Sequence, residues 1–360
     1  MLGAGGRTGR AVLDELVRDG HEVLALTSFP DRLTSGGATL PSGQVEVRES
    51  RADSVAELAS ALRGSDALVD VAGPYAPRTT VGLEAALRAG VHYLDASMEP
   101  SATSRVHQQH DRVRDAGVVA VTAGGFPAAV LDLLGHAALR AAEGARELHV
   151  ATTYLDRGWL RAAGGAATRE VLAALLERPV AAVVGGVLVE EPVGEARRLA
   201  WFPRPVGLAH AAGVPGTAVL SIARRDPELT TVREYLAMSG WRAELLQLAA
   251  SATGWTPARR WLRRGVRGPG APSIDQRRRS VRWACVAETQ GAQGTVRAWA
   301  NGHDPAAAAA ASLSVLVRAV VAHDGSGVRT PAQLSGPDTL LDELTHGRDL
   351  RWAVIRPDVP

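Results

Sequence analysis

The stretch that decides the fold reads Gly3-Ala4-Gly5-Gly6-Arg7-Thr8-Gly9-Arg10, close to the start of the chain. Glycines at this spacing, between a strand and a helix, let the backbone approach a pyrophosphate because no side chain blocks it. The amides that open the next helix then point at the phosphates, with the helix dipole behind them. An amphipathic helical pattern does follow, with apolar residues at Val12, Leu13 and Leu16. The sequence therefore predicts a dinucleotide-binding turn made by Gly3, Gly5, Gly6, Arg7, Thr8 and Gly9.

The strand that leads into this turn is very short in the sequence. Met1 and Leu2 alone precede Gly3. Two explanations stay open: the central strand is unusually short, or the natural chain extends upstream of Met1. A short strand would weaken the anchoring of the turn, so this feature bears directly on affinity for a dinucleotide.

Strand and helix patterns alternate over the first part of the chain, which is typical of a parallel, doubly wound sheet. The predicted strands cover residues 22–27, 45–48, 67–72, 92–95 and 118–122. The predicted helices cover residues 54–62, opened by Asp53 as N-cap, 81–89, 101–115 and the stretch that ends at Leu139. We therefore expect an α/β fold with a Rossmann-type dinucleotide-binding domain over residues 1–145.

The pattern of strand-like and helix-like segments changes in the remaining chain, and it predicts a second, α+β domain over residues 146–300. Strand patterns cover residues 149–154 and 201–202, and a hairpin is expected from 283–288 and 295–300. A helical period runs over 233–250. We expect this domain to carry the substrate and a dimer contact. Residues 301–360, with an alanine-rich helix over 306–323, are predicted to pack back on the first domain.

The end of the second predicted strand distinguishes between the two nicotinamide cofactors. Sites that prefer NAD(H) place Asp or Glu there for the ribose hydroxyls. Here the strand ends Leu26-Thr27-Ser28-Phe29, without an acid. Arg7 and Arg32 are placed to meet a 2′-phosphate, with a hydrogen bond from Ser28. The sequence therefore favours NADP(H), and Asp31 is the residue that argues for NAD(H).

Composition limits the catalytic chemistry that is open to this chain and indicates the cellular compartment that we expect for it. The chain has 360 residues, 46% hydrophobic and 22% charged, with a formal net charge of +2. Cys285 is the single cysteine, which excludes an internal disulfide and a cysteine-based metal cluster. No membrane-spanning run or signal peptide is visible, so we expect a cytoplasmic protein. Lysine is absent, which removes Schiff-base chemistry and any Tyr-Lys proton-transfer pair.

Two features suggest other ligands but have simpler explanations. The segment between Trp255 and Arg282 is rich in arginine, yet few aromatic residues are interleaved for base stacking. We interpret it as a solvated helix face and loop, and expect neither nucleic acid nor membrane as partner. His107 and His110 have an i, i+3 spacing without a third ligand in view. We interpret them as part of a solvent-facing helix and predict no metal site.

Several stretches follow one another in the order found in a known enzyme family. After the glycine-rich turn they are residues 71–75 (Val-Ala-Gly-Pro-Tyr), 89–95 (Ala-Gly-Val-His-Tyr-Leu-Asp), 124–127 (Gly-Gly-Phe-Pro) with 132–135 (Asp-Leu-Leu-Gly), 201–207 (Trp-Phe-Pro-Arg-Pro-Val-Gly) and 327–332 (Gly-Val-Arg-Thr-Pro-Ala). Together they resemble the saccharopine dehydrogenase-like oxidoreductases, the group with saccharopine reductases and trans-acting enoyl reductases. The resemblance spans most of the chain.

The resemblance implies a Rossmann domain, a second domain with the substrate pocket, and NADP-linked reduction of C=C or C=N bonds. It also implies that Ala72, Gly73 and Pro74 lie beside the cofactor, near the nicotinamide ribose. Enzymes that form saccharopine use lysine and histidine for proton transfer, and this chain has no lysine. The enoyl-reductase side of the family is therefore the better match.

Four residues are candidates for the chemistry around the transferred hydride. Tyr75 follows a strand's carboxyl end, where ligands bind in doubly wound sheets, although a packing aromatic is an equal explanation. The other three are Glu99, Tyr154 and His210.

The function that we predict is an NADPH-dependent reductase of a small, largely apolar substrate, with a homodimer through the second domain as an open expectation. Two alternatives remain: a non-redox cyclase or isomerase that keeps the fold, and a cofactor-sensing interaction protein.

Overall fold

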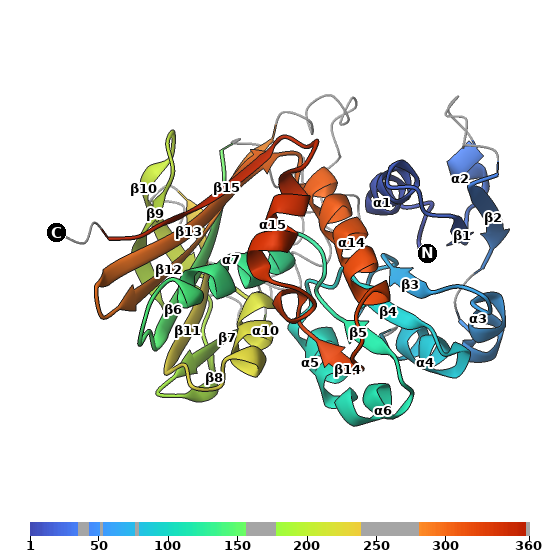
Figure 1. Ribbon diagram of the computed structural model, residues 1–360, viewed down its shortest axis with the longest axis horizontal. Coiled ribbons are helices and arrows are strands. Elements are labelled where there is room, and N and C mark those ends of the chain that lie inside the picture. Colours follow the sequence, from blue (N-terminus) through green and yellow to red (C-terminus); the bar gives the residue numbers. More distant parts are fainter. Residues whose placement is uncertain (35–42, 51–52, 76–78, 156–177, 239–280, 358–360) are drawn as a thin grey trace, which may run out of the picture. The chain divides into compact units, whose positions relative to one another are not determined.

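The computed structural model describes residues 1–34, 43–50, 53–75, 79–155, 178–238 and 281–357 (Figure 1). The chain divides into two compact units, each built from two segments. The first unit is Met1–Phe126 with Ala306–Ser335, and the second is Pro127–Pro305 with Gly336–Pro360. The boundary therefore falls earlier than residue 145, because helix α7 (Ala128–Arg140) packs on strands of the second unit. The residues after 300 are likewise shared between the units.

The first unit contains a parallel sheet that Leu2 completes at its centre. Leu2 forms parallel bridges with Leu26 on one side and Asp70 on the other, and so joins a two-stranded and a four-stranded part. The order is β2-β1-Leu2-β3-β4-β5-β14. The strands are β1 (Val23–Thr27), β2 (Val45–Glu49), β3 (Ala67–Asp70), β4 (His92–Asp95), β5 (Val119–Val121) and β14 (Gly327–Arg329). This confirms the predicted doubly wound sheet, with the order reversing between Leu2 and β3.

Helices of the first unit alternate with these strands. They are α1 (Arg7–Arg18), α2 (Asp31–Thr34), α3 (Val55–Ala61), α4 (Thr79–Ala89), α5 (Pro100–Gln108), α6 (His110–Asp115), α14 (Pro305–Val321, in this unit from Ala306) and the 3-10 turn Pro331–Gln333. Asp53 is not the N-cap of α3: the Ser54 hydroxyl accepts from the Glu57 amide at 3.3 Å. The helix predicted over 101–115 is two helices that meet at Gln109.

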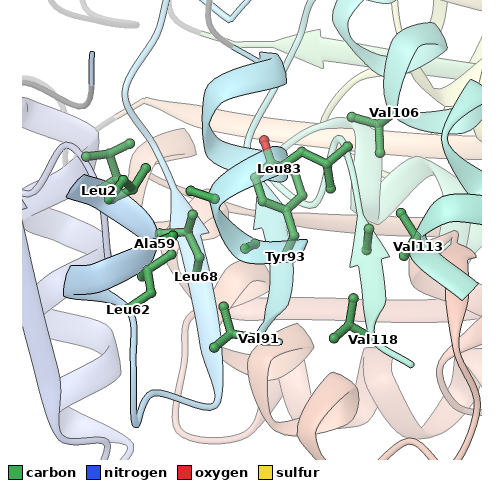
Figure 2. Close-up of a cluster of buried hydrophobic side chains, with 14 of the residues drawn as sticks. Leu2, Ala59, Leu62, Leu68, Leu83, Val91, Tyr93, Val106, Val113 and Val118 are labelled. Carbon is green, nitrogen blue, oxygen red and sulfur yellow. The ribbon is translucent and has the colours of Figure 1, made fainter. Parts of the chain in front are cut away.

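The core of the first unit lies between the sheet and these helices. Figure 2 shows side chains of the buried cluster converging from the central strand, from α3 to α6 and from β3 to β5. Tyr93 on β4 and Leu68 on β3 are fully buried within it. Burial on this scale stabilises by roughly 1.5–3 kcal/mol per large apolar side chain. Three of the strands end in a buried polar residue, namely Thr27 on β1, Asp70 on β3 and Asp95 on β4.

In the residues that the structure describes, the second unit contains a nine-stranded mixed sheet and helices. Its main order is β15-β13-β12-β6-β11-β10-β9, while β7 also pairs with β11, and β8 with β7. The strands are β6 (Glu147–Tyr154), β7 (Val180–Val184), β8 (Val187–Glu191), β9 (Arg197–Phe202), β10 (Gly207–Gly213), β11 (Thr231–Met238), β12 (Arg282–Gly291), β13 (Gly294–His303) and β15 (Leu350–Ile355). The helices in the described part of this unit are α7, α10 (Ala218–Arg225) and α15 (Pro337–Thr345). The hairpin β12–β13 was predicted and is confirmed.

The helix predicted over 233–250 is wrong at its start. Residues 231–238 form strand β11, which pairs in parallel with β6 and antiparallel with β10. These neighbours satisfy the backbone hydrogen bonds of β11 on both sides, which outweighs the local helical period. Residues 239–250 lie outside the described part of the chain.

Candidate functional site

The glycine-rich turn sits where Leu2 ends and α1 begins, and three of its glycines are required by close contacts. A Cβ on Gly9 would lie 2.0 Å from the Gly3 carbonyl oxygen. A Cβ on Gly5 would lie 2.5 Å from Thr27 Oγ1, and one on Gly3 2.9 Å from the Ala72 amide nitrogen. Gly3 also has a φ of +86°, which favours glycine. The turn thus packs directly against the ends of β1 and β3.

The start of helix α1 offers an anion site of the kind the sequence predicts. Gly6 is the N-cap and has no side chain with which to cap the helix, and the first turn contains no acidic residue. The turn is closed by hydrogen bonds from Gly6 N to Gly3 O (3.0 Å) and from Arg10 N to Gly6 O (2.8 Å). Thr8 lies in the first turn of α1. Helix-start amides together with the helix dipole favour a phosphate here.

The end of β1 carries a hydroxyl where NAD-preferring sites carry a carboxylate. Ser28 is exposed, and its hydroxyl donates to the Ser50 carbonyl at 3.1 Å. The Thr27 hydroxyl oxygen accepts from the Phe29 amide at 3.1 Å and so fixes the turn after the strand. Arg7 is the first residue of α1 and Arg32 belongs to α2, but their side chains lie outside the described part of the structure. The environment suits a 2′-phosphate better than a pair of ribose hydroxyls.

The loop after β3 brings the predicted residues Ala72, Gly73 and Pro74 next to the glycine-rich turn. Ala72 is the residue that Gly3 approaches, and its amide donates to Asp70 Oδ1 at 2.9 Å. The Gly73–Pro74 peptide bond is cis. Two sets of residues that are far apart in the sequence therefore form one edge of the sheet, as the prediction of a cofactor site requires.

Tyr75 is buried, and its hydroxyl donates to the Asp70 carbonyl at 3.3 Å. Burial, with Asp70 and Asp95 nearby, raises the pKa of Tyr75 well above its usual value, so the phenol keeps its proton. This geometry favours the packing explanation over a role in proton transfer. The Tyr75 amide donates to Glu99 Oε1 at 2.8 Å, which brings two of the predicted residues together.

Asp95 joins the loops after β4 and β5 and was not among the predicted site residues. Its Oδ1 accepts from the Ser97 amide (2.9 Å), the Ala123 amide (2.9 Å) and the Thr122 hydroxyl (3.1 Å). Ala123 is held at a φ of +57°, a conformation that costs a non-glycine residue about 1 kcal/mol. Burial raises the pKa of Asp95. The signal in the sequence was its position at the carboxyl end of a buried strand.

Tyr154 and His210 belong to the second unit and lie on different strands. Tyr154 ends β6 and is half-buried, and burial raises the pKa of its phenol. His210 lies on β10, is exposed, and pairs with Met238 on β11. Strand β11 separates β6 from β10, so these two candidates do not form a pair like that of Tyr75 and Glu99.

Sequence reasoning missed Glu234, a buried carboxylate on β11. Its Oε2 accepts from the Ala218 amide at 3.0 Å, at the start of α10, and burial raises its pKa to about 7. A carboxyl with a raised folded-state pKa stabilises the protein fully below its unfolded pKa, and this stability is lost as the pH rises through the folded pKa. Between pH 4.5 and 8, the loss is about 3 kcal/mol.

We expect Glu234→Gln to lack this loss. The difference in unfolding free energy, variant minus wild type, should grow by about 3 kcal/mol between pH 4.5 and pH 8 in urea titrations. The exposed Glu190 provides the control, because Glu190→Gln should leave the pH dependence unchanged. A difference that stays constant with pH would contradict the assignment.

Two other interpretations of the sequence concern the histidine pair and the arginine-rich segment. His110 does not simply face solvent: its Nδ1 accepts from the Val328 amide at 3.1 Å, which ties α6 to β14. Within the described ranges, no group of three or more His, Cys, Asp or Glu side chains is placed to hold a metal ion.

Most of the arginine-rich segment, residues 255–280, lies outside the described ranges. No helix in the described part of the chain is both long and apolar enough to cross a bilayer.

Strand order, glycine-rich turn and edge loops define the first unit as a Rossmann-type dinucleotide-binding domain. Residues 1–121 match the family described as the saccharopine dehydrogenase NADP binding domain. The chain therefore carries an NADP-binding domain of the saccharopine dehydrogenase type over residues 1–121, and it is an NADP-binding oxidoreductase. This confirms the resemblance seen in the sequence for the first 121 residues, and it confirms the expectation of NADP(H). No curated protein matches the chain.

Solved structures share the fold at low sequence identity. Apo saccharopine dehydrogenase (L-Glu forming) from Saccharomyces cerevisiae is 14% identical, with 99% of each chain covered and a TM-score of 0.61. The diaminopimelate (DAP) dehydrogenase of C. glutamicum, solved with DAP, is 16% identical, with 95% of this chain and 97% of that one covered and a TM-score of 0.44. The first likeness shows that this chain and the yeast enzyme share a fold.

Proposed function

We propose that this protein is an NADPH-dependent reductase that delivers hydride to an activated C=C or C=N bond of a small, largely apolar organic substrate. The observation that carries the proposal is the glycine-rich turn at the start of α1. Close contacts there leave no room for side chains, and no side chain caps the helix. The hydroxyl of Ser28 at the end of β1, in place of a carboxylate, supports NADPH over NADH.

Different residues of the first unit would bind different parts of the cofactor. The amides of the turn and of the first residues of α1 would bind the pyrophosphate. Ser28, Arg7 and Arg32 would bind the 2′-phosphate. Ala72, Gly73 and Pro74 would lie beside the nicotinamide ribose. NADPH, when bound, supplies the hydride, and the protein supplies position and exclusion of water.

The second unit would supply the substrate pocket and the proton. Tyr154 and His210 are the candidates for that proton. A tyrosine phenol is protonated at neutral pH, and burial raises the pKa of Tyr154 further. The absence of lysine argues against chemistry on an amino-acid substrate of the saccharopine type and favours an enoyl-like acceptor. A cytoplasmic location and a homodimer through the second unit complete the proposal.

Cofactor preference tests the proposal directly. In a fluorescence titration, NADPH should bind the purified protein at least about 10-fold more tightly than NADH, which corresponds to about 1.4 kcal/mol. Ser28→Asp places a carboxylate at the end of β1 and should weaken NADPH through charge repulsion while leaving NADH equal or tighter. Equal or absent binding of both cofactors to the wild-type protein would contradict the proposal.

A further inference from the structure

Three buried carboxylates link the loops at the carboxyl edge of the first sheet into one chain of hydrogen bonds. Asp95 holds the loops after β4 and β5 together. The Glu99 side chain then reaches from the loop after β4 to the loop after β3, where it accepts the Tyr75 amide. Asp70 holds Ala72, the residue packed against Gly3. The backbone of residues 73–75 is thus fixed at both of its ends.

Glu99 is ordered before any ligand arrives. It is the N-cap of α5, and its carbonyl accepts from the Ala102 amide (2.9 Å) and the Thr103 amide (3.1 Å). Its own amide donates to the Ser97 hydroxyl at 3.1 Å. The residue is 5% exposed. A side chain fixed in this way provides a rigid acceptor at no further cost in conformational entropy.

The position of this acceptor assigns it to one half of a bound dinucleotide. In a doubly wound sheet the dinucleotide crosses the point where strand order reverses, with one nucleotide on each side. Here that point lies between Leu2 and β3. The 2′-phosphate side is the end of β1, so the nicotinamide half falls on the side of β3 and β4. Tyr75 and Glu99 both lie on that side.

We propose that Glu99 is a positioning residue for the nicotinamide half of the cofactor, acting through the backbone of residues 73–75. This inference rests on the proposed function. Glu99→Ala removes the hydrogen bond from the buried Tyr75 amide to Glu99, and the loop then moves away from the nicotinamide ribose. The adenosine half, bound at the turn and the end of β1, is left as it was.

The test compares two ligands and two variants by fluorescence or calorimetric titration. One ligand is NADPH and the other is adenosine 2′,5′-bisphosphate, which lacks the nicotinamide and its ribose. Glu99→Ala should weaken NADPH about 10- to 100-fold and the fragment less than about 2-fold. Glu99→Gln should stay within about 3-fold of wild type for both, because its amide oxygen accepts the same hydrogen bond. Glu46→Ala, at a pair on the surface of β2, is the control and should change neither.

Other outcomes overturn the inference. Equal weakening of both ligands by Glu99→Ala would indicate general damage to the domain, and no weakening would show that the contact is idle. Glu99→Gln behaving like Glu99→Ala would show that charge, and not the acceptor, matters. If Glu99→Ala does not fold, Glu99→Asp, which withdraws the acceptor by one methylene, is held to the same expectation. Wild-type protein that binds neither ligand would instead remove the proposed function itself.

Discussion

Replacing Gly9 by alanine is expected to abolish NADPH binding, with a loss of about 100-fold or more in affinity. The added Cβ would lie 2.0 Å from the carbonyl oxygen of Gly3 and 2.9 Å from its carbonyl carbon. Both are backbone atoms, so no flexible side chain can move aside. The turn itself must shift, and its amides leave the position from which they bind a pyrophosphate. Fluorescence titration with NADPH measures the loss directly.

The matched control is the same replacement at Gly90, after α4. Gly90 has a φ of +69°, and a Cβ there would meet nothing within 4 Å. Gly90→Ala should therefore cost about 1 kcal/mol in stability without changing NADPH affinity. A Gly9→Ala protein that binds NADPH as tightly as the Gly90→Ala protein would show that the turn does not hold the cofactor.

Replacing Asp132 by alanine is expected to lower the free energy of unfolding of the second unit by about 3–5 kcal/mol. Asp132 on α7 forms an ion pair with Arg225 on α10, and their side chains are 1% and 4% exposed. Without the carboxylate, the buried guanidinium keeps Asp226, at 2.8 Å from its Nε, and the carbonyl of residue 132 as partners. These do not replace the lost charge within the helix interface. Urea unfolding followed by circular dichroism gives the difference.

A second variant separates loss of the pair from loss of packing. Asp132→Leu combined with Arg225→Met removes both charges and fills the space with apolar groups, and it should recover most of the stability. If the single Asp132→Ala variant stays within 1 kcal/mol of wild type, roughly the size of an exposed pair, the pair does not carry the interface.

The elements of the first unit were predictable because each follows from a local pattern. Strands such as β4 (His92–Asp95) are short apolar runs bounded by glycine or helix signals, and the glycine-rich turn is contiguous in the sequence. Element ends were less well predicted, as at Ser54, where adjacent Asp and Ser are both good N-caps. Strand β11 was missed since its pairing partners, β6 and β10, are distant in the sequence.

The same distinction between local patterns and contacts of distant residues applies to the candidate site. Gly3 lies against Ala72, and Gly9 lies against Gly3, because the topology of a doubly wound sheet brings these loops to one edge. The hydrogen bond between Tyr75 and Glu99 spans 24 residues, and that between Asp95 and Ala123 spans 28. Periodicity carries no information on such pairs. The contact of Glu234 with the start of α10 is equally invisible in the sequence, because a buried carboxylate within a strand resembles a surface one.

The first unit is interrupted in the chain, and this has a consequence for its biogenesis. Strand β14 and most of α14 are translated only after the whole span from Pro127 to Pro305 has been synthesised. Until then Gly124 lacks Leu313 and Leu316 as neighbours, and β5 presents an open edge. A fragment that stops at Phe126 is therefore expected to aggregate, whereas a fusion of residues 1–126 to 306–335 through a short linker contains every strand of the sheet.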